Sequence, residues 1–143
     1  MHKPLKQLYL ILLLPAAILI PLVYLVCETA LLPIGPMTIA PVFHPAFFIA
    51  GAVCAIAGPI FIRTWFAHSV RDRTSVTEKE FMKFQKRLLW VALVTPYLAL
   101  AGLWLSLPKF YIADIVLMAL YAVYYYYPSV QRIRFDARIF KVK

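Results

Sequence analysis

Long apolar stretches alternate with short charged segments along this chain. No charged residue lies between Gln7 and Cys27, and the apolar pattern continues around Glu28 to about residue 32. A second uncharged run covers residues 29–62, and further apolar runs cover residues 88–108 and 111–127. Because a hydrocarbon core of about 30 Å needs about 20 helical residues, the pattern predicts four transmembrane helices. We place them at about 8–32, 46–66, 88–107 and 111–127, with a loop between the first two marked by Pro33, Gly35, Pro36, Pro41 and Pro45.

Composition agrees with a membrane protein of one bundle. The chain has 143 residues, of which 64% are hydrophobic, and its mean hydropathy is +0.80. This is too apolar for a soluble domain and too short for a second bundle. The sequence therefore predicts an all-α integral membrane protein, a single four-helix bundle made of two hairpins.

The basic residues predict the orientation of the bundle. Fourteen of the fifteen Lys and Arg residues fall in three patches, at residues 3–6, 63–87 and 132–143, and Lys109 is the exception. Cationic short loops stay in the cytoplasm, so both termini and the central patch are expected inside, with a bacterial inner membrane as the default. The first span is expected to stay uncleaved, since no small-x-small pair ends it. The net charge of +9 favours anionic lipid headgroups as partners and not nucleic acid.

The central basic patch contains a helix-start signal. Thr77 and Glu80 have the spacing of a capping box, and Val76 and Phe81 that of a hydrophobic staple. We expect a cytoplasmic amphipathic helix that begins near Thr77 and runs unbroken into the third span. Its apolar stripe would enter the bilayer boundary, while the opposite face would meet anionic headgroups through Lys79, Lys83 and Lys86. A docking surface for a soluble partner is the alternative.

Small residues and prolines predict how the spans pack and bend. One small-residue stripe consists of Gly51, Ala55 and Gly58, and a second consists of Ala92, Thr95, Ala99 and Gly102. Such stripes allow close backbone approach between helices in lipid. Bends are expected in three of the four helices, at Pro15, Pro21, Pro59 and Pro96.

The tail after Pro128 alternates charged and apolar residues. This period-2 pattern is typical of a β-strand, and we expect it to lie along the headgroups with Arg132, Arg134 and Arg138 facing outward. Pairing with a sheet edge of another protein is the alternative. Arg63, late in the second span, is expected to extend to the cytoplasmic headgroups.

Four polar residues are expected near the outer face: Glu28, His44, Lys109 and Asp114. At one depth they could form a proton relay, a cation site or a catalytic pair. They could equally be independent interface groups, which is the outcome we expect. No metal site or cofactor is predicted, because His2, His44 and His68 are widely spaced and no histidine lies well inside a span. Cys27 and Cys54 could be packing residues or a disulfide.

No motif in the chain specifies an activity. The sequence favours an accessory or structural subunit of a larger membrane complex, without enzymatic activity and with a membrane-protein partner. One alternative is an oligomeric small transporter or channel that uses Glu28 and Asp114. Another is an outer-face membrane enzyme that acts on lipid or quinone through His44 and the same two carboxylates.

Overall fold

The computed structural model describes residues 2–29, 39–72 and 75–142, and its regular secondary structure is helical throughout. In chain order the elements are α1 (His2–Thr29), the 3-10 turn η1 (Pro41–Phe43), α2 (His44–Ala52), the π-helical η2 (Val53–Ala57), α3 (Gly58–Ser69), α4 (Glu78–Ala92), α5 (Thr95–Trp104), α6 (Lys109–Tyr125) and α7 (Val130–Ile139). One isolated bridge, between Val76 and Val142, is the only β-type pairing in the described ranges. The predicted all-α fold is confirmed.

Three of the described helical segments are long and apolar enough to cross a membrane. They are Lys3–Cys27, Pro41–Ser69 and Glu78–Trp104. A fourth is obtained when α6 and α7, which meet at a bend of 76°, are counted together as one broken span. The first helix begins at His2, earlier than the predicted residue 8, and the predicted end of its span at residue 32 lies outside the described residues.

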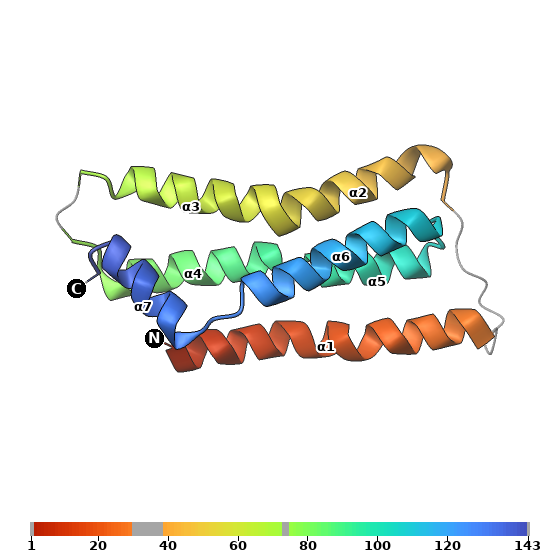
Figure 1. The fold of residues 1–143 in the computed structure, drawn as a ribbon, viewed down its shortest axis with the longest axis horizontal. Helices are drawn as coiled ribbons and strands as arrows, with labels where there is room; N and C mark the ends of the chain where they lie inside the picture. Colours follow the sequence, from red (N-terminus) through yellow and green to blue (C-terminus); the bar gives the residue numbers. More distant parts are fainter. Residues whose placement is uncertain (1, 30–38, 73–74, 143) are drawn as a thin grey trace.

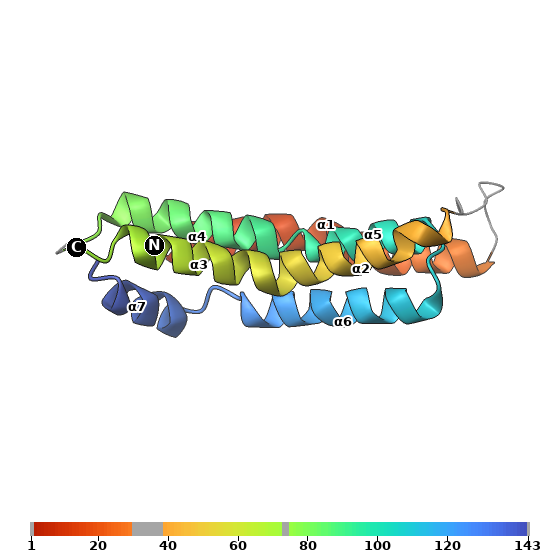
Figure 2. The ribbon, with the colours of Figure 1, turned by 90° about the horizontal axis from the view of Figure 1, so that it is seen from above.

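The three candidate spans and α6 form a bundle with α4–α5 and α6 as its centre. Figure 1 shows α1 on one side of these helices and α2–α3 on the other. The view in Figure 2 shows α2–α3 lying over the space between α4–α5 and α6. The packing follows this arrangement, since α1 contacts α4 and α5, α2 contacts α5 and α6, and α3 contacts α4. The third span is therefore more buried by the rest of the bundle than the first two.

Both chain ends and the α3–α4 connection lie at the same end of the bundle (Figure 1). The three basic patches of the sequence belong to these segments, whereas Lys109 begins α6 at the opposite end. Among the described residues the fold thus gathers all Lys and Arg residues except Lys109 at one end, which we call the cationic end.

Proline disturbs the helical hydrogen bonding of the second and third spans, as predicted. The π-helical turn η2 directly precedes Gly58 and Pro59, where the proline has no N–H to donate to the carbonyl of Ala55. A turn at Leu93–Val94 separates α4 from α5 just before Pro96. The expectation of an unbroken helix from Thr77 through the third span is therefore correct only as far as Ala92. In α1 the helix continues through both Pro15 and Pro21.

Helix α4 starts where the sequence predicts, but the predicted capping hydrogen bond is not formed. Thr77 has the extended N-cap conformation, yet its side chain makes no capping hydrogen bond. Val76 and Phe81 are both buried in one apolar cluster, as a hydrophobic staple requires. The apolar stripe of α4, which includes Phe81, Phe84 and Leu88, is buried within the protein and does not enter the bilayer boundary as predicted.

The small-residue stripes lie at helix contacts, as predicted. Ala92, Thr95, Ala99 and Gly102 are all buried along α4–α5. On the second span Gly51 faces α6 and Gly58 faces Val91 of α4. Tyrosine hydroxyls add two bonds that hold α1: Tyr97 donates to the carbonyl of Leu12 (2.6 Å) and Tyr9 to that of Val123 (2.8 Å). The Val123 carbonyl is in the last turn of α6, where helical partners run out.

The tail is a helix, so the predicted strand is wrong. Ser129 is the N-cap of α7, and its hydroxyl oxygen accepts a hydrogen bond from the backbone N–H of Arg132 at 3.2 Å. Ile133 and Asp136 are the buried residues of the helix, and its C-cap residue Phe140, four positions after Asp136, is buried as well. A period-2 pattern over ten residues also places residues at helical spacing, and here the cap and the tertiary packing select the helix.

Candidate functional site

The predicted outer polar residues lie at the end of the bundle opposite the cationic end. His44 is the first residue of α2, and its ring centroid is 5.8 Å from that of Tyr111 on α6. Asp114 is half-buried on α6 and Lys109 is exposed at its start, and these two described residues form no ion pair. The side chain of Glu28 lies outside the described part of the structure.

The described residues form neither a metal site nor a disulfide. Across residues 2–29, 39–72 and 75–142 no three His, Cys, Asp or Glu side chains come close enough to hold a metal ion. Cys27 is exposed on α1 and Cys54 is half-buried in η2, and both are free thiols.

The cations expected to contact headgroups are all at the cationic end. Lys79, Lys83 and Lys86 are exposed on α4, and Arg134 and Arg138 are exposed on α7. Arg132 differs, because it is half-buried and its guanidinium carbon lies 4.6 Å from the ring centroid of Tyr125 and 5.3 Å from that of Tyr126. Such cation–π contacts hold the start of α7 against the end of α6.

A buried carboxylate joins three helices at the cationic end. Asp136 of α7 is only 4% exposed. Its Oδ1 accepts a hydrogen bond from Nη2 of Arg63 on α3 at 2.8 Å, which is also an ion pair, and its Oδ2 accepts one from Nε2 of Gln85 on α4 at 3.0 Å. Both carboxylate oxygens are therefore satisfied, as a buried charge requires. We call these three residues the polar bridge.

The polar bridge overturns the expectation for Arg63. Its side chain does not extend to the headgroups but turns toward α7, and it is 36% exposed beside Asp136. An ion pair with a buried carboxylate is favoured over solvation at the headgroups because it neutralises a charge that would otherwise be enclosed alone.

Aromatic rings pack beside the polar bridge. Phe66 of α3 and Phe84 of α4 are stacked, with ring centroids 4.2 Å apart and planes 11° apart. Phe140, just after α7, contacts both rings edge-on at 5.1 and 5.6 Å. Because α3, α4 and the C-cap residue of α7 each contribute one ring, the aromatic cluster fixes the spacing of the same three helices that the polar bridge joins.

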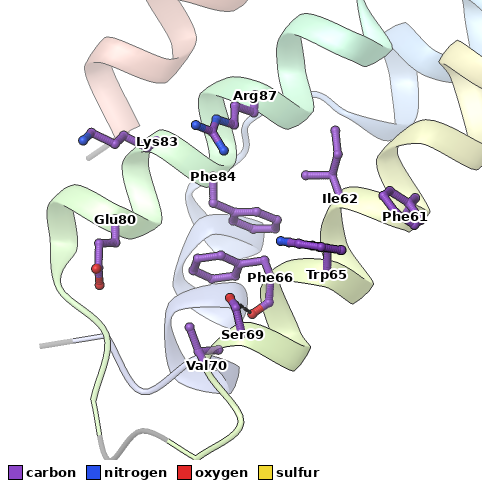
Figure 3. Close-up of a pocket in the computed structure, with 10 residues that line it drawn as sticks. All are labelled: Phe61, Ile62, Trp65, Phe66, Ser69, Val70, Glu80, Lys83, Phe84 and Arg87. Carbon is purple, nitrogen blue, oxygen red and sulfur yellow. Dashed lines mark hydrogen bonds between the residues drawn. The ribbon is translucent and has the colours of Figure 1, made fainter.

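A groove of about 450 Å³ opens between α3 and α4 next to this cluster. Figure 3 shows the rings of Trp65, Phe66 and Phe84 gathered between the two helices, with Lys83 and Arg87 on α4. The full lining is Phe61, Ile62, Trp65, Phe66, Ser69, Val70, Glu80, Lys83, Phe84 and Arg87. One wall is thus mostly apolar and the other carries charge, an arrangement suited to an amphiphilic ligand.

Comparison with family models, curated proteins and solved structures found no match for this chain.

Sequence reasoning missed both the polar bridge and the groove. One signal for the bridge was present: Asp136 is an acidic residue within a strongly basic tail, spaced at three and four residues from Ile133 and Phe140. That spacing predicts a helix with a polar group on its buried face, which calls for a basic or amide partner elsewhere in the chain. Nothing in the pattern identifies that partner as Arg63 and Gln85.

Proposed function

We propose that this chain is a four-span integral membrane protein of a bacterial inner membrane, with both termini in the cytoplasm. Two features support it. In addition to the three candidate spans, the chain has α6, which is 17 residues long and nearly uncharged and would be the fourth span. The cationic end carries both termini and the α3–α4 connection, and cationic segments are retained in the cytoplasm.

Reporter fusions test this topology. A reporter that is active only in the cytoplasm should be active after Lys143 and inactive after Val42, because these positions belong to opposite ends of the bundle. Activity after Val42 but not after Lys143 would reverse the proposed orientation. Activity at both positions would show that the first two spans do not form a transmembrane hairpin.

Within the membrane, we propose that the protein acts as an accessory or structural subunit of a larger complex. The observation that carries this proposal is the use of the polar bridge and aromatic cluster to hold α7 across the cationic end. The helix so fixed presents an outward face on which Arg134 and Arg138 accompany exposed apolar side chains, with Phe135 61% and Ile139 49% exposed. Rigid faces that combine arginine with large apolar side chains are typical of protein interfaces.

Purification of the intact chain in mild detergent tests this assignment. A photo-crosslinking residue in place of Phe135 should capture a distinct membrane protein that also co-purifies in fixed ratio with the unmodified chain. The same residue at Leu117, which is 67% exposed on α6, is the matched control and should capture less of that protein. Capture of a second copy of this chain alone would favour the oligomeric transporter, and no specific capture at Phe135 would contradict the role of α7.

A further inference from the structure

The directions of α3 and α4 show which end of the groove between them lies nearer the cationic end. Helix α3 runs toward the cationic end, and α4 runs back from it (Figure 1). Phe61 and Ile62 therefore line the part of the groove nearer the middle of the bundle, and Ser69 and Val70 line the part nearer the cationic end. The groove extends along the bundle, as a lipid acyl chain does in a bilayer leaflet.

The α3 wall exposes apolar surface to the groove and its mouth. Phe61 and Trp65 are 65% and 68% exposed, and their rings are 6.0 Å apart. The stacked rings of Phe66 and Phe84 also line the groove and lie between the two helices (Figure 3). A preformed apolar channel of this kind favours a hydrocarbon chain.

The α4 wall carries charge along one helical stripe. Glu80, Lys83 and Arg87 are three and four residues apart, so they lie on one face of the helix, and all three line the groove. Lys83 and Arg87 give this wall two basic side chains. Because α4 runs away from the cationic end, Arg87 is the one of the three nearest the middle of the bundle, where Phe61 and Ile62 line the opposite wall.

We propose that this groove is a binding site for one anionic phospholipid. The phosphodiester would lie against Lys83 and Arg87, and one acyl chain would run along Phe61, Ile62 and Trp65. A cavity of about 450 Å³ falls within the range of about 300–1,000 Å³ that is usual for small-ligand sites. The two basic side chains of the α4 wall suit the negatively charged phosphodiester of a lipid such as phosphatidylglycerol. This site goes beyond the accessory role proposed above and does not depend on it.

The polar bridge keeps both walls of this site in place. Arg63 follows Ile62 on the α3 wall and Gln85 follows Phe84 on the α4 wall, and both bind Asp136 of α7. The groove is therefore held at fixed width before any lipid enters, which lowers the ordering cost of binding.

Native mass spectrometry of the delipidated full-length protein tests the site. The probes are phosphatidylglycerol and phosphatidylcholine with the same acyl chains. We expect one molecule of phosphatidylglycerol to bind about 10- to 30-fold more tightly than phosphatidylcholine, since each basic residue near a lipid surface contributes about a factor of five. The double variant K83Q/R87Q should lose this preference. The control K79Q/K86Q removes the same charge from exposed positions outside the groove and should keep it.

A second measurement locates the acyl chain. The chain has three tryptophans, so the fluorescence of the W90F/W104F variant comes from Trp65 alone. Phosphatidylglycerol with a brominated acyl chain should quench this fluorescence at about one lipid per protein, and much less so in K83Q/R87Q. Equal loss of lipid preference in the two double variants, no preference for the anionic lipid, or quenching that only follows the bulk content of brominated lipid would overturn the proposal.

Discussion

Replacing Asp136 by Leu is expected to lower the free energy of unfolding by about 3 kcal/mol and to detach α7. Removing one partner of a buried ion pair costs about 3–5 kcal/mol of stability, because the charge of the other partner is left unpaired. The low end applies here, since Arg63 is 36% exposed and can reach water once Asp136 is gone. Gln85 would also lose its acceptor. Unfolding of the purified protein in a titration with denaturing detergent measures the loss, and limited proteolysis of α7 measures its detachment.

A set of matched variants separates charge from shape in this experiment. Asp136→Asn keeps the acceptor oxygen and should cost less than Asp136→Leu. The double variant R63M/D136L removes both charges and should recover much of the loss, as apolar replacement of buried pairs commonly does. Asp72→Leu, at an exposed position, is the control and should change stability by less than about 0.5 kcal/mol. If the double variant is no more stable than D136L, the interaction of Arg63 with Asp136 is not what holds α7.

The sequence predicts the long apolar helices well because hydrophobicity is a local property of each segment. An uncharged run of about 20 residues needs no knowledge of its neighbours to be assigned to a span. The small-residue stripe from Ala92 to Gly102 is equally readable, and all four of its residues are buried in the structure. Prolines likewise act on their own helix, so the altered backbone before Pro59 and Pro96 follows from the sequence.

The site was not predictable in the same way because its contacts join distant segments. Arg63 and Asp136 are 73 residues apart in sequence, and Gln85 and Asp136 are 51 apart. A charge pattern predicts which end of the bundle a residue belongs to, but not which residues meet there. The strand prediction for the tail failed for a related reason: its ten residues fit both periods, and the choice depends on burial of Ile133, Asp136 and Phe140 against other helices.

Gly58 offers the second large effect, and two physical arguments predict opposite signs for its replacement by alanine. Alanine is favoured over glycine inside a helix by about 1 kcal/mol, so local propensity predicts a more stable protein. The structure predicts the reverse. A Cβ at this position would lie 2.8 Å from Cγ1 of Val91 on α4 and 3.0 Å from the backbone carbonyl oxygen of Val53. That carbonyl belongs to the π-helical turn and accepts the N–H of Gly58, so it cannot move away freely.

We therefore expect Gly58→Ala to lower the free energy of unfolding by about 1–3 kcal/mol, the usual cost of overpacking a tight contact. Unfolding in the same detergent titration gives the value. Gly102→Ala is the matched control, because its added Cβ would meet its nearest neighbours at 3.9 and 4.0 Å, and it should be neutral or stabilising. Combining Gly58→Ala with Val91→Ala should restore only part of the loss, since the Val53 carbonyl remains in place. A Gly58→Ala protein as stable as the Gly102→Ala control would show that α3 and α4 do not approach this closely, and the width of the groove they enclose would have to be revised.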